Sequence, residues 1–288
     1  MELIHTVDWM KQVSRQAREE GGIVGLVPTG GGLHAGHLSL VEAAHRECSP
    51  VVVSVFSDPR DRDPAQGRGR PLLDADRAAL ESLAANYLFA PSPEEFFPPD
   101  FQTSVIVSEI TERLEGRSRP GHLRAVAATV LKLFAIIQPA FIYVGRREAQ
   151  RACMLRRMAR DLNLDTRIVV GPIVREPDGL AVSSRNACLN DDERRAALAL
   201  PRALAAAREQ IARGERMAGE ISEKMSSVLA SEPLATVDYV EIVDADTFGP
   251  APRLRGSCLA VVAAFIGPAR LTDNMLIEEE NGHAVCFL

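Results

Sequence analysis

The stretch VPTGGGLHAGHLSLVEAA, residues 27–44, decides the expected fold. It starts at the end of a short apolar run, IVGLV at 23–27, passes through three glycines and enters a helical pattern from His37 to Glu47. In a strand–turn–helix unit of this kind, the backbone N–H groups of the turn and the positive end of the helix dipole favour an anion. The segment therefore predicts an anion-binding turn between a buried strand and a helix.

His34 and His37 add side-chain donors to this turn. They stand three residues apart beside the start of the helix, where their ring nitrogens can donate to phosphate oxygens. This order of features favours phosphate binding over a glycine-rich surface turn with two incidental histidines. A metal site is less favoured, because the segment has no nearby carboxylates.

Further along, short apolar runs alternate with helical patterns. Strands are expected at 51–56, at 141–145, at 166–174 and at the start of 87–99, and helices at 76–86, 124–137 and 146–163. This alternation predicts an α/β fold with an open parallel sheet, covered by helices on both faces.

The pattern changes after Val174. A polar, turn-rich stretch, REPDGLAVSSRN, precedes two helical patterns and three strands, expected at 191–214, 217–231, 237–244, 258–266 and 269–278. We therefore expect two domains, a larger α/β domain over residues 1–174 and a smaller α+β domain over residues 175–288.

Composition excludes several classes of protein. The net charge of −6 makes a large cationic surface for nucleic acid improbable. No apolar run approaches the roughly 20 residues of a membrane span, and the first residues carry no apolar signal core. The five cysteines are scattered and form no CxxC, which favours a reduced cytoplasm over disulfides or structural zinc.

A second segment, REPDGLAVSSRNACL at 175–189, carries Ser183, Ser184 and Arg185. Two hydroxyls and a planar cation suit a polyphosphate. Read alone, SSRN is an ordinary loop sequence. It gains weight only beside the HxGH turn at 34–37.

These two segments, together with VSVFSDP, RPGHLRAVAATVLKLFAIIQP, YVGRREAQ, RRMARDLNL, VDYVEIVD and ARLTDNMLIE, resemble the pantothenate synthetase (pantoate–β-alanine ligase) family over almost the whole chain. The resemblance implies a Rossmann-like, doubly wound ATP-binding domain and a C-terminal lid. It also implies a cytoplasmic homodimer and a reaction that needs ATP and Mg²⁺. In that reaction ATP first activates a carboxylic acid as an acyl-adenylate, and an amine then displaces AMP.

The resemblance also assigns residues. Those with catalytic roles are His34, His37, Arg147, Ser183, Ser184 and Arg185. The ATP site adds Pro28, Thr29, Gly30, Gly36, Gly145, Glu148, Val174 and Val182, and the substrate site comprises Asp58, Asp61, His122, Gln150 and Arg151. Asp74 and Asp76 are the nearest acidic candidates for Mg²⁺, although we expect no metal cage built from protein ligands.

The chain departs from the family pattern mainly around the acid substrate. A methionine of the family is Gly30 here, and an asparagine and a glutamine are Asp58 and Asp61. Later, the pattern G-(Q/E)-K-D-x-Q-Q becomes GRREAQR at 145–151. Replacing buried polar partners weakens binding of the original ligand. These changes favour an acid or amine other than pantoate and β-alanine.

Three alternatives stay open. The chain is an ordinary member of the family with drifted pocket residues, a nucleotidylyltransferase that stops at adenylate transfer, or a non-catalytic nucleotide-binding relative. We also expect Asp61 and Arg151 to face one another across the acid pocket, where they either bind a charged acid or bridge each other.

Overall fold

The computed structural model of the chain describes residues 1–59, 74–280 and 283–288. It divides into two compact units, Met1–Pro172 and Ile173–Leu288. The division lies two residues before the expected boundary at 174.

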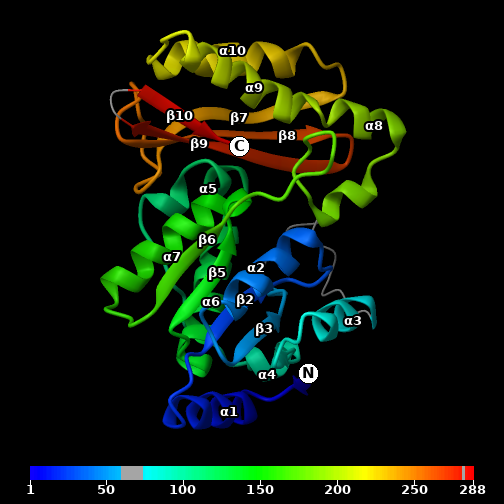
Figure 1. The fold of residues 1–288 in the computed structure, drawn as a ribbon, viewed down its shortest axis with the longest axis vertical. Helices are drawn as coiled ribbons and strands as arrows, with labels where there is room; N and C mark the ends of the chain where they lie inside the picture. The colour runs from blue at the N-terminus through cyan, green and yellow to red at the C-terminus, as the bar shows by residue number, and fades with distance from the viewer. Residues whose placement is uncertain (60–73, 281–282) are drawn as a thin grey trace. The chain divides into compact units, whose positions relative to one another are not determined.

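The first unit is built on a six-stranded parallel sheet (Figure 1). Its order is β1-β4-β3-β2-β5-β6. The strands are β1 (Glu2–Ile4), β2 (Gly25–Thr29), β3 (Val51–Val55), β4 (Tyr87–Phe89), β5 (Phe141–Gly145) and β6 (Arg167–Gly171). β2 and β3 are buried along their whole length, as expected for apolar strands covered on both faces. The expected α/β fold with a doubly wound parallel sheet is confirmed.

The strand order fixes where a ligand can bind. From β2 the chain crosses first to β3 on one side, and later to β5 on the other. In open α/β sheets, ligands bind outside the carboxyl ends of the strands at such a reversal. Two segments therefore flank the crevice position, the turn that follows Thr29 and the turn that follows Gly145.

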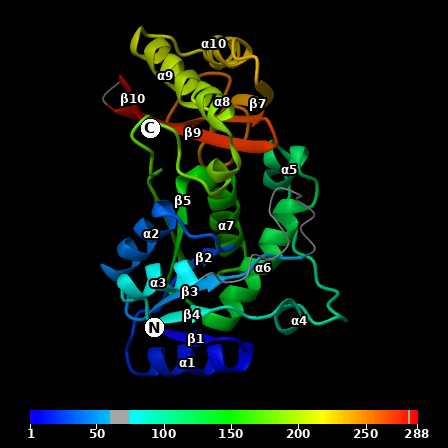
Figure 2. The same ribbon diagram turned by 90° about the vertical axis from the view of Figure 1, so that its right-hand side faces the viewer.

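Helices cover both faces of this sheet (Figure 2). One face packs against α2 (Ala35–His45) and α3 (Asp74–Ser82), and Leu40, Val41 and Leu80 join its core. The other face carries α6 (His122–Ile137) and α7 (Ala149–Asp161). Shorter helices are α4 (Pro93–Phe96), η1 (Ile110–Glu112), α5 (Glu115–Ser118) and η2 (Arg146–Glu148). The sequence reasoning missed β1 and the amphipathic helix α1 (Val7–Glu19).

The second unit is a four-stranded antiparallel sheet of order β10-β9-β8-β7, with helices on one face (Figure 1). The strands are β7 (Ala235–Asp244), β8 (Ser257–Ile266), β9 (Ala269–Glu280) and β10 (His283–Phe287). Leu204 of α9 (Ala199–Ala212) and Ile221 of α10 (Ala218–Ala230) share a core with the sheet. This architecture confirms the expected α+β class.

The single helix expected over 191–214 is in fact two helices, α8 (Asp191–Ala196) and α9. Asn190 starts α8 with a capping box. Pro201 lacks a backbone N–H and therefore fits the first turn of a new helix better than a helix interior. Over the described residues, no helix combines the length and apolar character that a membrane span requires.

Candidate active site

The glycine turn after β2 is fixed by a carboxylate. Gly31 and Gly32 have φ values of +85° and +65°, which glycine adopts without a steric penalty. The N–H groups of Gly32 and Leu33 donate to Asp76 at 3.0 and 2.8 Å. Asp76 is buried in the first turn of α3. The carboxylate thus holds the turn in shape from behind.

This contact gives Asp76 a structural role, and its expected role as a magnesium ligand stays a prediction. Each of its two oxygens already accepts a backbone N–H. Asp74 lies in the same first turn of α3 but is exposed. The described residues contain no group of three His, Cys, Asp or Glu side chains placed to hold a metal.

His34 caps α2. Its backbone is extended, and its Nδ1 accepts the N–H of Gly36 at 3.2 Å. The N–H groups of His37 and Leu38 bond its carbonyl. This cap explains why α2 begins two residues before the expected start. With Nδ1 as an acceptor, the neutral imidazole carries its proton on Nε2, which leaves one N–H donor for a ligand.

His37 stacks on His34, with ring centroids 4.0 Å apart. Burial and the neighbouring imidazole lower the pKa of His37 to about 3. Burial, followed by the charge of Arg147, also lowers the pKa of His34. Both rings are therefore neutral at pH 7 and act as N–H donors without charge. Positive charge at this turn comes from arginine.

The turn after β5 supplies that charge. Register places Gly145 level with Gly171 on β6, and β2 pairs with the other edge of β5. Arg147 and Glu148 lie in η2, directly after Gly145. Desolvation would raise the pKa of Glu148, but Arg151 and Arg147 outweigh it and lower the pKa to about 2. The Glu148 carboxylate is thus ionised and near His37.

Arg151 pairs with Glu148 at 2.7 Å. This contact explains part of the low pKa of Glu148 and gives Arg151 a partner that the sequence did not predict. The predicted partner, Asp61, lies outside the described residues, so the Asp61–Arg151 contact stays a prediction. Asp58 is buried on the segment that follows β3.

Gln150 has a structural role, which its predicted part in substrate binding did not anticipate. Its amide donates to the carbonyls of Ile110 and Arg113 at 2.7 and 2.8 Å, and its oxygen accepts the Glu115 N–H at 3.1 Å. Both amide hydrogens and the oxygen are therefore used inside the protein. Gln150 holds the 110–115 segment against α7.

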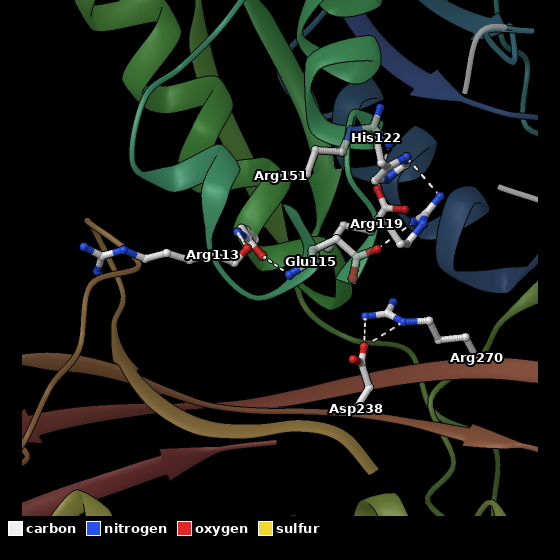
Figure 3. A network of polar contacts seen from close by, with 9 residues as sticks. Arg113, Glu115, Arg119, His122, Arg151, Asp238 and Arg270 are labelled. Carbon is white, nitrogen blue, oxygen red and sulfur yellow. Dashed lines mark hydrogen bonds and ion pairs between the residues drawn. The ribbon is translucent and has the colours of Figure 1, made fainter. Parts of the chain in front are cut away.

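His122 begins α6 beside an ion pair (Figure 3). Arg119 donates to Glu115 at 2.6 Å, and its other Nη lies 3.0 Å from His122 Nδ1. Because a guanidinium only donates, Nδ1 accepts, and the neutral ring carries its proton on Nε2. An electrostatic interaction between His122 and Glu148 places this cluster near the β5 turn.

The strand end before the glycines is rigid. Pro28 and Thr29 are buried, and the Thr29 hydroxyl donates to the Ser54 carbonyl at 2.9 Å. Gly30 is exposed, and a Cβ added there would meet no atom within 4 Å. Gly30 therefore leaves open space at the mouth of the turn.

In the second unit, Val174 and Val182 are opposite ends of a tight hairpin. The Val182 N–H donates to the Val174 carbonyl at 2.9 Å, and Arg175 bridges to Ala181. Gly179 closes the hairpin at φ +92°. This hairpin places the residues that follow Val182 at its exit.

Ser183 at that exit caps the short helix η3 (Ser184–Cys188). Its hydroxyl oxygen accepts the N–H of Arg185 at 3.2 Å, so its own hydrogen can be donated outward. Ser183 is buried, whereas Ser184 is exposed. The three residues thus present hydroxyl and guanidinium donors, as a polyphosphate requires.

The sequence reasoning missed the residues that support these groups. The contact of Asp76 with the glycine turn was not predicted, and Arg119, Asp273 and Arg194 were not singled out. The arginine of RPGH, three residues before His122, was the only one of these with a visible local signal. The others act across long sequence separations.

Comparison with known proteins decides the family. Residues 2–276 match the family model described as pantoate-beta-alanine ligase. The chain belongs to the pantoate–β-alanine ligase family. It is 44% identical to the pantothenate synthetase of Thermotoga petrophila, over 96% of this chain and all of that protein. It is 46% identical to that of Chloroflexus aurantiacus, over 97% and 99% of the two chains.

Solved structures agree with this assignment. The pantothenate synthetase of Thermus thermophilus matches with a TM-score of 0.89 and 39% identity, over 95% of this chain and 98% of that one. A Francisella tularensis pantoate-beta-alanine ligase, described as complexed with beta-gamma ATP and beta-alanine, matches with a TM-score of 0.76 and 28% identity, over 96% and 97%. The chain is therefore an ATP-dependent, amide-forming ligase that produces AMP.

Proposed function

We propose that this chain joins pantoate to β-alanine, as its relatives' names state for them. The observation that carries the proposal is the match to pantothenate synthetases over 96% of the chain, with the glycine turn and both histidines at the sheet's reversal point. This favours the ordinary family activity over the altered substrate that the pocket departures had suggested.

In the proposed first step, a carboxylate oxygen of pantoate attacks the α-phosphorus of ATP. A P–O bond forms, the bond to the β-phosphate oxygen breaks, and pyrophosphate leaves. Negative charge develops on phosphate oxygens, so donors already in place lower the barrier. His34 and His37 would donate to these oxygens, and Arg147 would supply fixed positive charge.

The other assigned residues have supporting roles in the proposal. Ser183, Ser184 and Arg185 would hold the β- and γ-phosphates, and Gly145 and Glu148 would contact the ribose. Val174 and Val182 would hold the adenine, and Pro28, Thr29, Gly30 and Gly36 would complete the strand end and helix start beside the nucleotide. Asp58, Asp61, His122 and Arg151 would surround the acid.

In the second step the amine of β-alanine attacks the acyl carbon of the adenylate. A C–N bond forms, the C–O bond to AMP breaks, and the proton lost by the amine passes to solvent water. His122, whose Nδ1 accepts from Arg119, would orient the acid by donating a hydrogen bond from Nε2.

Mg²⁺ would reach the site on the phosphates of ATP. This ion keeps several waters and binds through few protein carboxylates. The engaged oxygens of Asp76 fit that arrangement better than direct coordination. We also propose, from the family resemblance, a cytoplasmic homodimer, which light scattering of the purified protein would test.

The test combines ATP, Mg²⁺, pantoate and β-alanine with the purified chain. We expect stoichiometric AMP, pyrophosphate and pantothenate, measured by mass spectrometry. AMP and pyrophosphate formed only with a different acid would favour the altered-substrate alternative. Pyrophosphate released without an amide product would favour a nucleotidylyltransferase, and no turnover would favour a nucleotide-binding relative.

A further inference from the structure

The hairpin that carries Val174 and Val182 is attached to the sheet of the second unit by one buried ion pair. Arg175 donates to Asp273 of β9 with both Nη atoms, at 2.7 and 3.0 Å. The Asp273 side chain is only 2% exposed. Two parallel bonds between a guanidinium and a carboxylate fix orientation as well as distance.

Arg175 also bonds to the backbone of its own hairpin. The same Nη1 that meets Asp273 donates to the Gly179 carbonyl at 3.0 Å. The backbone of Arg175 bridges to Ala181. The Arg175 side chain therefore links β9 to the hairpin turn, and its backbone contacts the arm of the hairpin that leads to Ser183.

A second set of contacts stiffens the far side of the hairpin. Asn186 donates to Glu176 and to the Ala181 carbonyl at 2.8 and 3.1 Å. Arg194 of α8 meets Glu176 at 2.7 Å and Asp178 at 2.6 Å. The Ser183–Arg185 segment is thus held at both its entry and its exit.

We propose that Asp273 and Arg175 are positioning residues for ATP activation, which hold the Ser183–Arg185 segment in its phosphate-binding conformation. The inference rests on the proposed function. Neither side chain needs to touch a phosphate. A hydroxyl or N–H donor displaced from the developing charge contributes far less to catalysis. The Asp273 carboxylate can therefore affect the rate without touching ATP, by fixing where these donors lie.

The test compares Asp273→Asn and Arg175→Lys with a matched control, Asp244→Asn. Asp244 ends β7 in the same unit, and its carboxylate accepts two backbone N–H groups and the Thr247 hydroxyl. We expect Asp273→Asn and Arg175→Lys each to lower kcat/KM for ATP about tenfold, which corresponds to about 1.4 kcal/mol of lost transition-state stabilisation. Their KM for pantoate should stay within twofold of wild type. Asp244→Asn should leave both values unchanged, even where it lowers Tm.

A double variant separates positioning from loss of stability. If Asp273 acts through Ser183, Asp273→Asn should cost less than threefold in a Ser183→Ala background, because coupled residues are not additive. Full additivity, or an unchanged kcat/KM for ATP in both single variants, overturns the inference. ATP binding, measured by calorimetry on the same proteins, tests the positioning role independently of the proposed ligase activity. Wild type that binds ATP without making pantothenate refutes the proposed substrate, while weaker ATP binding in the pair variants alone still supports the positioning role.

Discussion

The glycine turn of the first unit and the Ser183–Arg185 segment of the second present donors in different ways. In the turn, two neutral imidazoles stand at a helix start, and the expected backbone donors are engaged within the protein, since the N–H groups of Gly32 and Leu33 donate to the Asp76 carboxylate. In the segment, side-chain hydroxyls and a guanidinium stand at the exit of a hairpin held by ion pairs. The donors of both regions are visible in local sequence patterns, whereas the distant side chains that hold them, Asp76 and Asp273, are not.

The largest expected effect comes from the histidines. Replacing either His34 or His37 by alanine removes a neutral donor at developing phosphate charge. We expect adenylation, measured as pyrophosphate release, to fall about 10²–10³-fold, the typical cost of one such donor. His5→Ala is the control, because His5 is exposed and bonds only the Ala90 carbonyl in the described structure. Wild-type rates in both variants would remove the histidines from the proposed mechanism.

The next effect tests what holds the turn. Asp76→Ala leaves the Gly32 and Leu33 N–H groups without their acceptor, which costs about 1–3 kcal/mol per buried group. We expect lower Tm and a kcat/KM for ATP reduced about 10- to 100-fold, since 1.4 kcal/mol is tenfold. Asp74→Ala, on the exposed side of the same helix turn, is the matched control.

Raising Mg²⁺ discriminates between the two roles of Asp76. A carboxylate that braces backbone cannot be replaced by more metal, so activity should stay low at every Mg²⁺ concentration. Recovery of the Asp76→Ala variant at high Mg²⁺ would instead restore the metal-ligand role.

The same contrast explains how far sequence reasoning reached. Apolar strand runs separated by helices predicted the parallel sheet, because burial on both faces selects continuous apolar residues. The short edge strand β1 was missed, since three residues carry too little pattern. The predicted start of a helix was wrong by two residues where a side chain acts as the cap, as His34 does for α2.

For the site, local patterns predicted groups but not their partners. His34 and His37 stack as their spacing of three on a helix start allows. Arg151 pairs with Glu148, and Gln150 serves the backbone, although both were expected to face substrate. Asp273 meets Arg175 across 98 residues. Such long-range choices depend on the packing of the whole unit, which no single window of sequence reveals.

The third effect concerns acid stability of the turn. The unfolded His37 takes up a proton below its ordinary pKa of 6.5, whereas the folded ring resists protonation to about 3. Acid therefore favours the unfolded state. The contribution of neutral His37 to the free energy of unfolding is complete above pH 6.5 and is lost as pH falls toward 3. The maximum change between pH 6.5 and 5 is about 2 kcal/mol for one group.

The measurement is the free energy of unfolding of wild type and His37→Gln from denaturant titrations at pH 7, 6 and 5. Glutamine cannot be protonated, so the variant should lose less stability over this range. Glu148 does not interfere, because its pKa is lowered from 4.5 to about 2 and its contribution is lost only below pH 4.5. Parallel curves for the two proteins would show that His37 is not buried in its neutral form.

The smallest expected effect concerns the Arg151–Glu148 ion pair of the first unit. Arg151 and Glu148 form a partly exposed pair, with side chains 21% and 49% accessible, and such pairs contribute about 0–1 kcal/mol. Arg151→Gln should therefore change Tm little. It removes the largest charge that lowers the pKa of Glu148, so that pKa should rise. If ionised Glu148 accepts from the ribose, the acid limb of kcat/KM for ATP moves to higher pH.

Arg157→Gln is the matched control for this last experiment. Arg157 pairs with Asp161 at 2.7 Å near the other end of α7, also over one helical turn. Arg157→Gln should leave the pH profile of kcat/KM unchanged, because its partner Asp161 lies at the end of α7 opposite to Glu148. An unshifted limb in Arg151→Gln would show that Glu148 does not act on ATP in its ionised form. A shift in both variants would trace it to the helix instead of the pair.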